Sequence, residues 1–150
     1  MTAMSEALPV FAQTQTETYE FIDRVAEELQ LNDRHHGYAA LRAVLHALRD
    51  RLPPAAAVHL SAQMPMLLRG IFFESWKFSE SPTKERSADD FVGRVDDRLP
   101  PGYPLDSWPT TRGVFAVLWE RMDPGEIDNV IATLPEAIKR LWPQKYVAGL

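Results

Sequence analysis

The chain has 150 residues, of which 45% are hydrophobic and 25% are charged, and it contains no cysteine. This composition is typical of a globular protein and excludes a disordered or fibrous one. The lack of cysteine excludes disulfides, thiolate catalysis and every zinc site with a cysteine ligand. The formal net charge of −5 argues against nucleic acid as a partner, because non-specific affinity for nucleic acid depends on clustered Lys and Arg.

The amino-terminal residues lack the basic start and apolar run of a secretory signal, and the sequence has no apolar stretch of about 18 residues. The absence of cysteine also fits a reducing compartment. We therefore expect a cytoplasmic protein without a membrane partner.

The periodicity of apolar residues predicts two helices in the first third of the chain. In the first helix, apolar residues follow the i, i+3, i+4, i+7 rule from Ile22 to Leu29. In the second, apolar residues step by three and four from Tyr38 to Leu52, and Val44 widens the stripe. The second helix is therefore expected to be the more buried.

Prolines divide the next segment into a third and a short fourth helix. Pro54 suits a first helical turn, and the apolar run that follows it ends at Pro65. The fourth helix is expected to start near Pro65. Residues 75–87 are polar and lack periodicity, so they predict an exposed linker. Residues 1–13 and 143–150 are expected to be frayed, and no segment predicts a strand.

The second half repeats the first when the sequence is shifted by 70 positions, so that residues 21–72 align with 91–142 without a gap. Eleven aligned positions are identical, and they include Pro54/Pro124 and Pro65/Pro135. Ser87 with Asp90 predicts a capped helix start, and so does Asp123 with Glu126. We predict an all-α, pseudo-symmetric bundle of two three-to-four-helix units, residues 14–76 and 87–143, in one domain. A shared core is favoured over two lobes, because a unit of about 50–65 residues is marginal alone.

Two segments of the first half carry a resemblance to a known family. They are ALRAVLHALRDRLP at residues 40–53 and LSAQMPMLLRGIFFESW at residues 60–76. Over about residues 14–143 the chain resembles a bacterial family known as domain of unknown function (DUF) 2267. The resemblance implies a small all-helical protein and brings no catalytic residue with it.

The four histidines do not form a metal-binding pattern. His35 and His36 are adjacent and point about 100° apart on a helix. His46 aligns with Ala116 and His59 with Asn129, so the repeated unit does not require them. We expect surface or capping roles, with His46 facing Asp50, and no metal or other cofactor.

Three arginines recur in both halves, as Arg24/Arg94, Arg42/Arg112 and Arg51/Arg121. Such side chains usually lie over the core edge and pair with carboxylates, for which Glu27, Glu28, Asp50, Asp97 and Glu120 are candidates. The alternative is an anion pocket between the units, in which Arg42 and Arg112 face each other.

The aromatic segment from Arg69 to Trp76 is the best candidate for a functional surface. Phe72 and Trp76 are expected to share a helical face, and Phe73 to cover the seam between the units or to contact a partner. No nucleophile elbow, phosphate-binding glycine loop or zinc-protease motif occurs. We therefore expect a non-catalytic interaction or scaffolding module that binds a protein or itself, through Arg42, Arg112, Arg69, Phe72, Phe73 and Trp76. The alternative is a small-molecule (anion) binder or enzyme with its pocket between the units.

Overall fold

The structure is a computed structural model and describes residues 6–143. Over this range the fold is all-helical and has no strand, as the sequence predicts. In chain order the elements are α1 (Pro9–Glu28), α2 (Arg34–Arg51), α3 (Pro54–Ser61), α4 (Met66–Phe73), the 3₁₀ helix η2 (Phe78–Glu80), α5 (Ala88–Arg98), α6 (Ser107–Arg121), α7 (Pro124–Ala132) and α8 (Glu136–Lys139).

The helix starts follow the local signals in the sequence. Ser87 Oγ accepts a hydrogen bond from the Asp90 amide at 3.0 Å, and the Asp123 carboxylate accepts one from the Glu126 amide at 3.2 Å. These bonds satisfy amides that have no partner within the helix. α3 and α7 both begin with a proline, whereas Pro65 precedes the first residue of α4.

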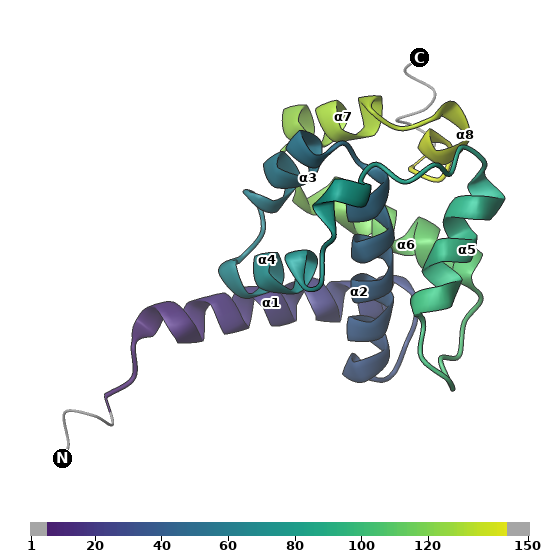
Figure 1. The fold of residues 1–150 in the computed structure, drawn as a ribbon. Coiled ribbons are helices and arrows are strands. Elements are labelled where there is room, and N and C mark those ends of the chain that lie inside the picture. The colour runs from purple at the N-terminus through teal and green to yellow at the C-terminus, as the bar shows by residue number, and fades with distance from the viewer. Residues whose placement is uncertain (1–5, 144–150) are drawn as a thin grey trace.

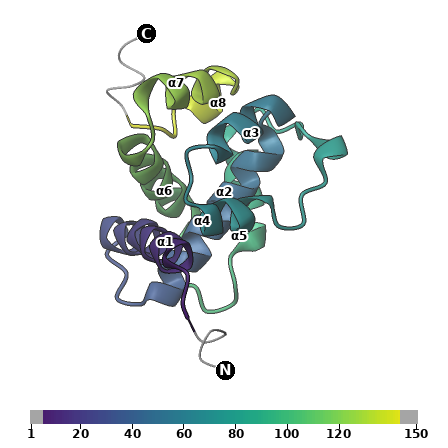
Figure 2. The ribbon, with the colours of Figure 1, turned by 90° about the vertical axis from the view of Figure 1, so that its left-hand side faces the viewer.

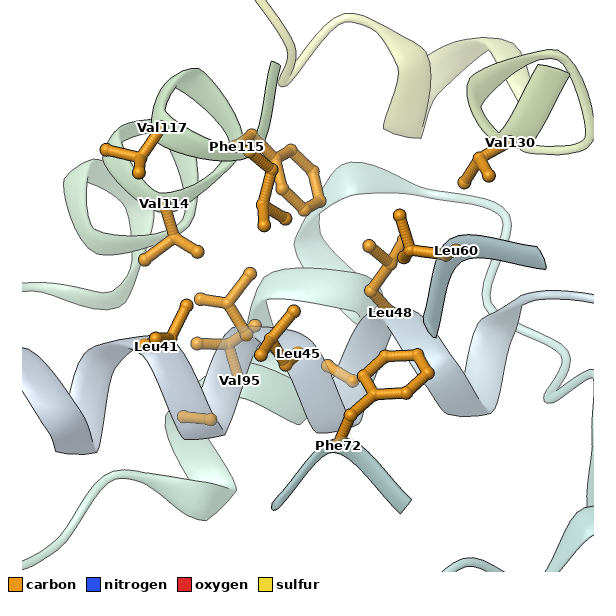
Figure 3. Close-up of a cluster of buried hydrophobic side chains, with 14 of the residues drawn as sticks. Leu41, Leu45, Leu48, Leu60, Phe72, Val95, Val114, Phe115, Val117 and Val130 are labelled. Atoms are coloured by element: carbon orange, nitrogen blue, oxygen red, sulfur yellow. The ribbon is translucent and has the colours of Figure 1, made fainter. Parts of the chain in front are cut away.

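α2 lies at the centre of the fold and contacts α1, α4, α5 and α6 (Figure 1). α1 packs against both α2 and α6, while α3 packs against α7 at the opposite end (Figure 2). The buried side chains form one cluster that draws on both halves of the chain. In Figure 3, Leu41, Leu45 and Leu48 follow one side of α2, and Val114 and Phe115 approach them from α6.

Two glycines allow α1 to approach its neighbours closely. A Cβ atom on Gly37 of α2 would lie 2.9 Å from the carbonyl oxygen of Ile22 in α1. A Cβ atom on Gly113 of α6 would lie 2.4 Å from Leu29 Cδ2. Because the Ile22 oxygen belongs to the backbone, a larger residue at position 37 would force α1 outward, whereas one at position 113 would require the Leu29 side chain to move.

α1 begins earlier than predicted. Residues 9–13 were expected to be frayed, but they belong to α1, which starts at Pro9. The physical reason is that proline suits a first helical turn, and the buried half of α1 has already formed the costly helical nucleus. The first turns of α1 project beyond the rest of the bundle (Figure 1). The other residues expected to be frayed include 1–5 and 144–150, which lie outside the described range.

The polar segment 75–87 is less exposed than predicted, because its end is bound to α2. Glu85 is buried. Its carbonyl oxygen accepts a hydrogen bond from Arg51 Nε at 2.6 Å, and the amide of Thr83 donates to the Asp50 carbonyl at 2.8 Å. A composition-based linker prediction cannot include such long-range partners.

Two arginines on different helices share one carboxylate beside this segment. Asp50 accepts from Arg49 Nε at 2.9 Å and from Arg98 Nη2 of α5 at 2.6 Å. Arg49 is buried and also donates to the carbonyl oxygens of Phe72 and Glu74. This network joins α2, α5 and the end of α4.

Candidate interaction surface

Large apolar side chains that remain exposed gather at one place on the molecule. Among the described residues ten are exposed, and seven of them lie on α1 or the residue before it, on α4, or at the start of α2. These seven are Leu8, Val10, Phe11, Tyr19, Tyr38, Met66 and Leu67. α1, α2 and α4 pack against one another, so exposed apolar side chains on these helices are candidates for a binding surface.

A groove lies within this surface, between α1, the start of α2, and α4. Its volume is about 290 Å³. We refer to it as the α1–α2–α4 groove. Its lining consists of Gln15, Thr18, Tyr19 and Ile22 from α1, Arg34, His35 and Tyr38 from α2, and Leu67 and Ile71 from α4. Its size is at the lower end of the range for ligand pockets, roughly 300–1,000 Å³, and would admit a few side chains.

The rim of the groove is held in place by Arg34. Its Nε and Nη2 atoms lie 2.8 and 2.7 Å from the two carboxylate oxygens of Asp23, and its guanidinium lies 4.1 Å from the centre of the Tyr19 ring. The hydrogen bond from Arg34 lowers the pKa of Asp23. Asp23 therefore stays ionised and neutralises Arg34, which leaves the tyrosine face fixed and the rim without net charge.

The wall of the groove contains a buried hydroxyl that lacks a hydrogen bond. Thr18 is 2% exposed, and its Oγ1 has no partner among the described residues. One turn earlier, Thr14 Oγ1 accepts a hydrogen bond from the Leu67 amide at 2.8 Å and so satisfies the start of α4. A buried polar atom without a partner is unfavourable, so this hydroxyl is a local cost to the packing of α1.

The apolar face of α1 that lines the groove continues toward the start of the helix, beyond the groove itself. At 100° per residue, Phe11 lies within about 20° of Ile22 on the helix circumference, three turns earlier. Ile22 is 5% exposed, whereas Phe11 is 62% exposed. The stripe of α1 that faces the core therefore runs on past the last helix that could cover it.

The predicted aromatic side chains contact one another in a row that leads from the core to the solvent. Phe72 is fully buried, Phe73 lies edge-on to it at 5.1 Å between ring centres, and Trp76 stacks on Phe73 at 5.2 Å. The expected shared helical face of Phe72 and Trp76 is wrong, because α4 ends at Phe73 and Ser75 adopts a φ of 60°. The chain turns there, and Trp76 folds back and donates to Ser81 Oγ at 3.1 Å. Phe78 is the exposed end of this cluster.

The three arginines predicted to contact a partner each bind an acceptor in their own half of the chain. Arg42 Nη2 lies 2.8 Å from the Glu74 carboxylate, and Arg112 Nη1 lies 3.4 Å from the Arg140 carbonyl oxygen. Arg69 donates to the carbonyl oxygen of Ser61, the last residue of α3, and to that of Met64 in the turn before α4. Arg42 also lines a hollow next to the groove, together with His35 and Tyr38.

The predicted carboxylate partners are confirmed for Arg24, which forms hydrogen bonds with Glu28 at 2.8 Å and with Glu120 of α6 at 3.0 Å. The predicted surface role of His46 is wrong. His46 is buried, and its Nε2 lies 2.7 Å from the Ile71 carbonyl oxygen. No group of three or more metal-ligating side chains occurs within residues 6–143.

Sequence reasoning missed most of the groove. Tyr38 was placed in the buried stripe of the second helix, but it is 38% exposed at the start of α2. Phe11 was placed in a frayed end. Two signals in the sequence pointed to the surface: Phe11, Thr18 and Ile22 share the spacing of one helix face, and only Leu68 of the run Met66–Leu67–Leu68 can face the core of a short helix.

The fold and this surface define a class of protein: a helical bundle with one shared core and an apolar groove on its surface. No helix among the described residues has the length and apolar character needed to cross a membrane. The chain belongs to the family described as uncharacterized conserved protein (DUF2267), whose model matches residues 18–141. The projecting turns of α1 precede this match. No curated protein matches the chain.

Proposed function

We propose that this protein is a non-catalytic interaction module whose α1–α2–α4 groove receives an amphipathic helix. The observation that carries the proposal is the gathering of exposed apolar side chains around this groove. Helix-in-groove recognition places an apolar face into such a site. Tyr19 and Tyr38 suit this role, because tyrosines supply a large contact area and lose little conformational entropy on binding.

We also propose that the bundle is an internal duplication of one helical unit. Three observations support this proposal. Helices begin at Pro54 and Pro124, 70 residues apart. The contact between α1 and α6 has its counterpart in the contact between α5 and α2. Arg42 binds just beyond the end of α4, and Arg112 binds just beyond the end of α8.

The groove lies where the two proposed units differ. α1 has 20 residues but α5 has 11, and the positions that correspond to the projecting turns of α1 fall in the segment before α5. At the shift of 70, Thr18 and Tyr19 correspond to Ala88 and Asp89, and Leu67 corresponds to Ala137. Ile22, Tyr38 and Ile71 correspond to the apolar residues Val92, Trp108 and Leu141, so the second unit lacks two of the groove's large apolar side chains, those of Tyr19 and Leu67. This difference supports a binding role added to a duplicated frame.

The proposal can be tested with a photo-crosslinking amino acid at position 67, in the groove. Val58 of α3 is the matched control, because it is an exposed apolar residue away from the groove. The crosslinked peptide is identified by mass spectrometry and synthesised. We expect this peptide to bind the purified protein, to become helical when bound, and to lose affinity for a Leu67→Glu variant but not for a Val58→Glu variant.

Two results would contradict the proposal. The first is the same set of crosslinked segments from positions 58 and 67. The second is a synthesised peptide that binds without becoming helical, or equally well to both glutamate variants. Circular dichroism of each variant verifies that the fold is retained.

A further inference from the structure

We propose that the helix received by the α1–α2–α4 groove is α1 of a second copy of this chain, so that the protein forms a symmetric dimer. This inference rests on the proposed function and names its partner. The projecting turns of α1 supply both requirements of a dimer contact: they carry an exposed apolar stripe, and the same stripe leads into the groove.

The projecting half of α1 is a helix without a covered apolar face. Phe11 is 62% exposed and lies on the side of α1 that becomes core at Ile22, and Leu8, the residue before α1, is 55% exposed. Helices in proteins owe most of their stability to packing of an apolar face rather than to helix propensity. A second copy covers this face with the same residue types that the groove presents.

The charge distribution on α1 favours such self-association. Residues 7–16 contain no charged side chain. Glu17 and Glu20 follow, but helical geometry turns both away from the face that carries Phe11, Thr18 and Ile22. Two antiparallel α1 helices therefore meet with uncharged faces, and the acidic side chains of the two copies do not oppose each other.

The helical positions fix a register for the pair. With the two-fold axis near Gln15, Phe11 of one copy meets Tyr19 of the other, because both lie four residues from residue 15. Gln15 lines the groove, and its amide then lies near Thr18 of the second copy. The contact is isologous and closed.

Cysteine crosslinking tests this register directly, because the natural chain has no cysteine. Gln15→Cys places a thiol at the proposed axis, and a disulfide needs Cβ atoms about 4 Å apart. Gln13→Cys is the matched control, since it replaces the same residue type on the opposite face of the same helix. We expect mild oxidation to convert the Gln15→Cys protein to a covalent dimer and to leave the Gln13→Cys protein unlinked.

Sedimentation equilibrium of the full chain measures the assembly without a crosslink. We expect a mass of twice 17.0 kDa for the wild type and for Val58→Glu, and 17.0 kDa for Phe11→Glu and Leu67→Glu, all with unchanged helical circular dichroism. A monomeric wild type would overturn the inference, as would a dimer that both Phe11→Glu and Leu67→Glu leave intact.

The remaining outcomes assign the surface to another occupant. If the wild type is monomeric and binds a helix of another protein through Leu67, the proposed dimer is wrong and the proposed function stands. A monomeric wild type that co-sediments through Phe11 with vesicles of phosphatidylethanolamine and phosphatidylglycerol overturns both.

Discussion

His46 of α2 and Ile71 of α4 are joined by a hydrogen bond between the imidazole Nε2 and the carbonyl oxygen, 2.7 Å apart. Because a carbonyl only accepts, the neutral ring carries its proton on Nε2. Burial lowers the pKa of His46 to about 4, and Arg49, Arg42 and Arg98 act in the same direction. A buried neutral imidazole therefore fixes the helix that forms one wall of the groove.

The stability of the protein is expected to fall with acidification in a window set by His46. Its pKa is about 4 in the folded chain and 6.5 as the ordinary value. Above pH 6.5 the ring is neutral in both the folded and the unfolded chain, so the neutral His46 contributes fully to the free energy of unfolding. Between 6.5 and 4 only the unfolded chain takes up the proton, so the free energy of unfolding decreases by about 3 kcal/mol in all. Below 4 the folded chain is protonated too, and the loss levels off.

Urea denaturation of the wild type and of His46→Gln at a series of pH values isolates this contribution. Glutamine can still donate to the Ile71 carbonyl but does not titrate. The difference in unfolding free energy between the two proteins should shift by about 3 kcal/mol from neutral pH to pH about 4. His59→Gln, at an exposed position, serves as the control. A constant difference between wild type and His46→Gln would contradict the assignment.

Removal of the carboxylate at position 50 should be strongly destabilising. Asp50 is bound to both Arg49 and Arg98, and the side chain of Arg49 is 5% exposed. Asp50→Asn leaves a buried guanidinium without a counter-charge, which we expect to lower the free energy of unfolding by about 2–4 kcal/mol. The exposed Asp89→Asn change in α5 should alter it by less than about 0.5 kcal/mol. Equal midpoints in urea for the two variants would show that the network contributes little.

Gly37 and Gly93 should respond oppositely to alanine. Both lie in helices, where alanine is intrinsically better by about 1 kcal/mol. A Cβ at position 37 meets the Ile22 carbonyl oxygen at 2.9 Å, whereas one at position 93 meets no atom within 4 Å. We expect Gly93→Ala to raise the melting temperature, and Gly37→Ala to destabilise by about 1–3 kcal/mol because α1 must move outward. A stabilised Gly37→Ala protein would refute the close contact.

The ion pair between α1 and α6 is expected to contribute modestly. Arg24 Nε and Nη2 each lie 3.0 Å from an oxygen of Glu120, and the two side chains are 23% and 47% exposed. A double-mutant cycle with Arg24→Ala and Glu120→Ala should give a coupling of about 0.5–1 kcal/mol that shrinks in about 1 M salt. A salt-independent coupling would point to packing rather than charge.

The first half of the chain should not fold alone. The buried face of α2 packs against α5 and α6, so a fragment of residues 6–83 would expose Leu41, Leu45 and Leu48 to water. We expect this fragment to lack a cooperative thermal transition under conditions in which the full chain shows one. A sharp transition in the fragment would indicate two independent lobes.

Prediction from the sequence succeeded where the signal is local. The prolines at 54 and 124, the caps at Ser87 and Asp123, and the apolar periodicity around Leu41 and Leu118 each act within one helix, so their effects are visible in one segment. The predicted shared helical face of Phe72 and Trp76 is wrong for a local reason as well: α4 ends at Phe73, and the turn at Ser75 carries Trp76 off the helix. The predicted surface role of His46 is wrong because its hydrogen-bond acceptor, the Ile71 carbonyl, is 25 residues away in the sequence.

The amino-acid sequence by itself determined that this chain is helical, where most helices begin, and which faces are apolar, because capping, proline geometry and the 3.6-residue period depend on neighbours in the chain. Only the tertiary structure decided which apolar residues remain exposed to solvent. Tyr19 and Tyr38 have the same chemistry as core residues, and they line a groove because they lie where α1, the start of α2 and α4 come together. Exposure is a property of where helices end relative to one another, and no single helix encodes it.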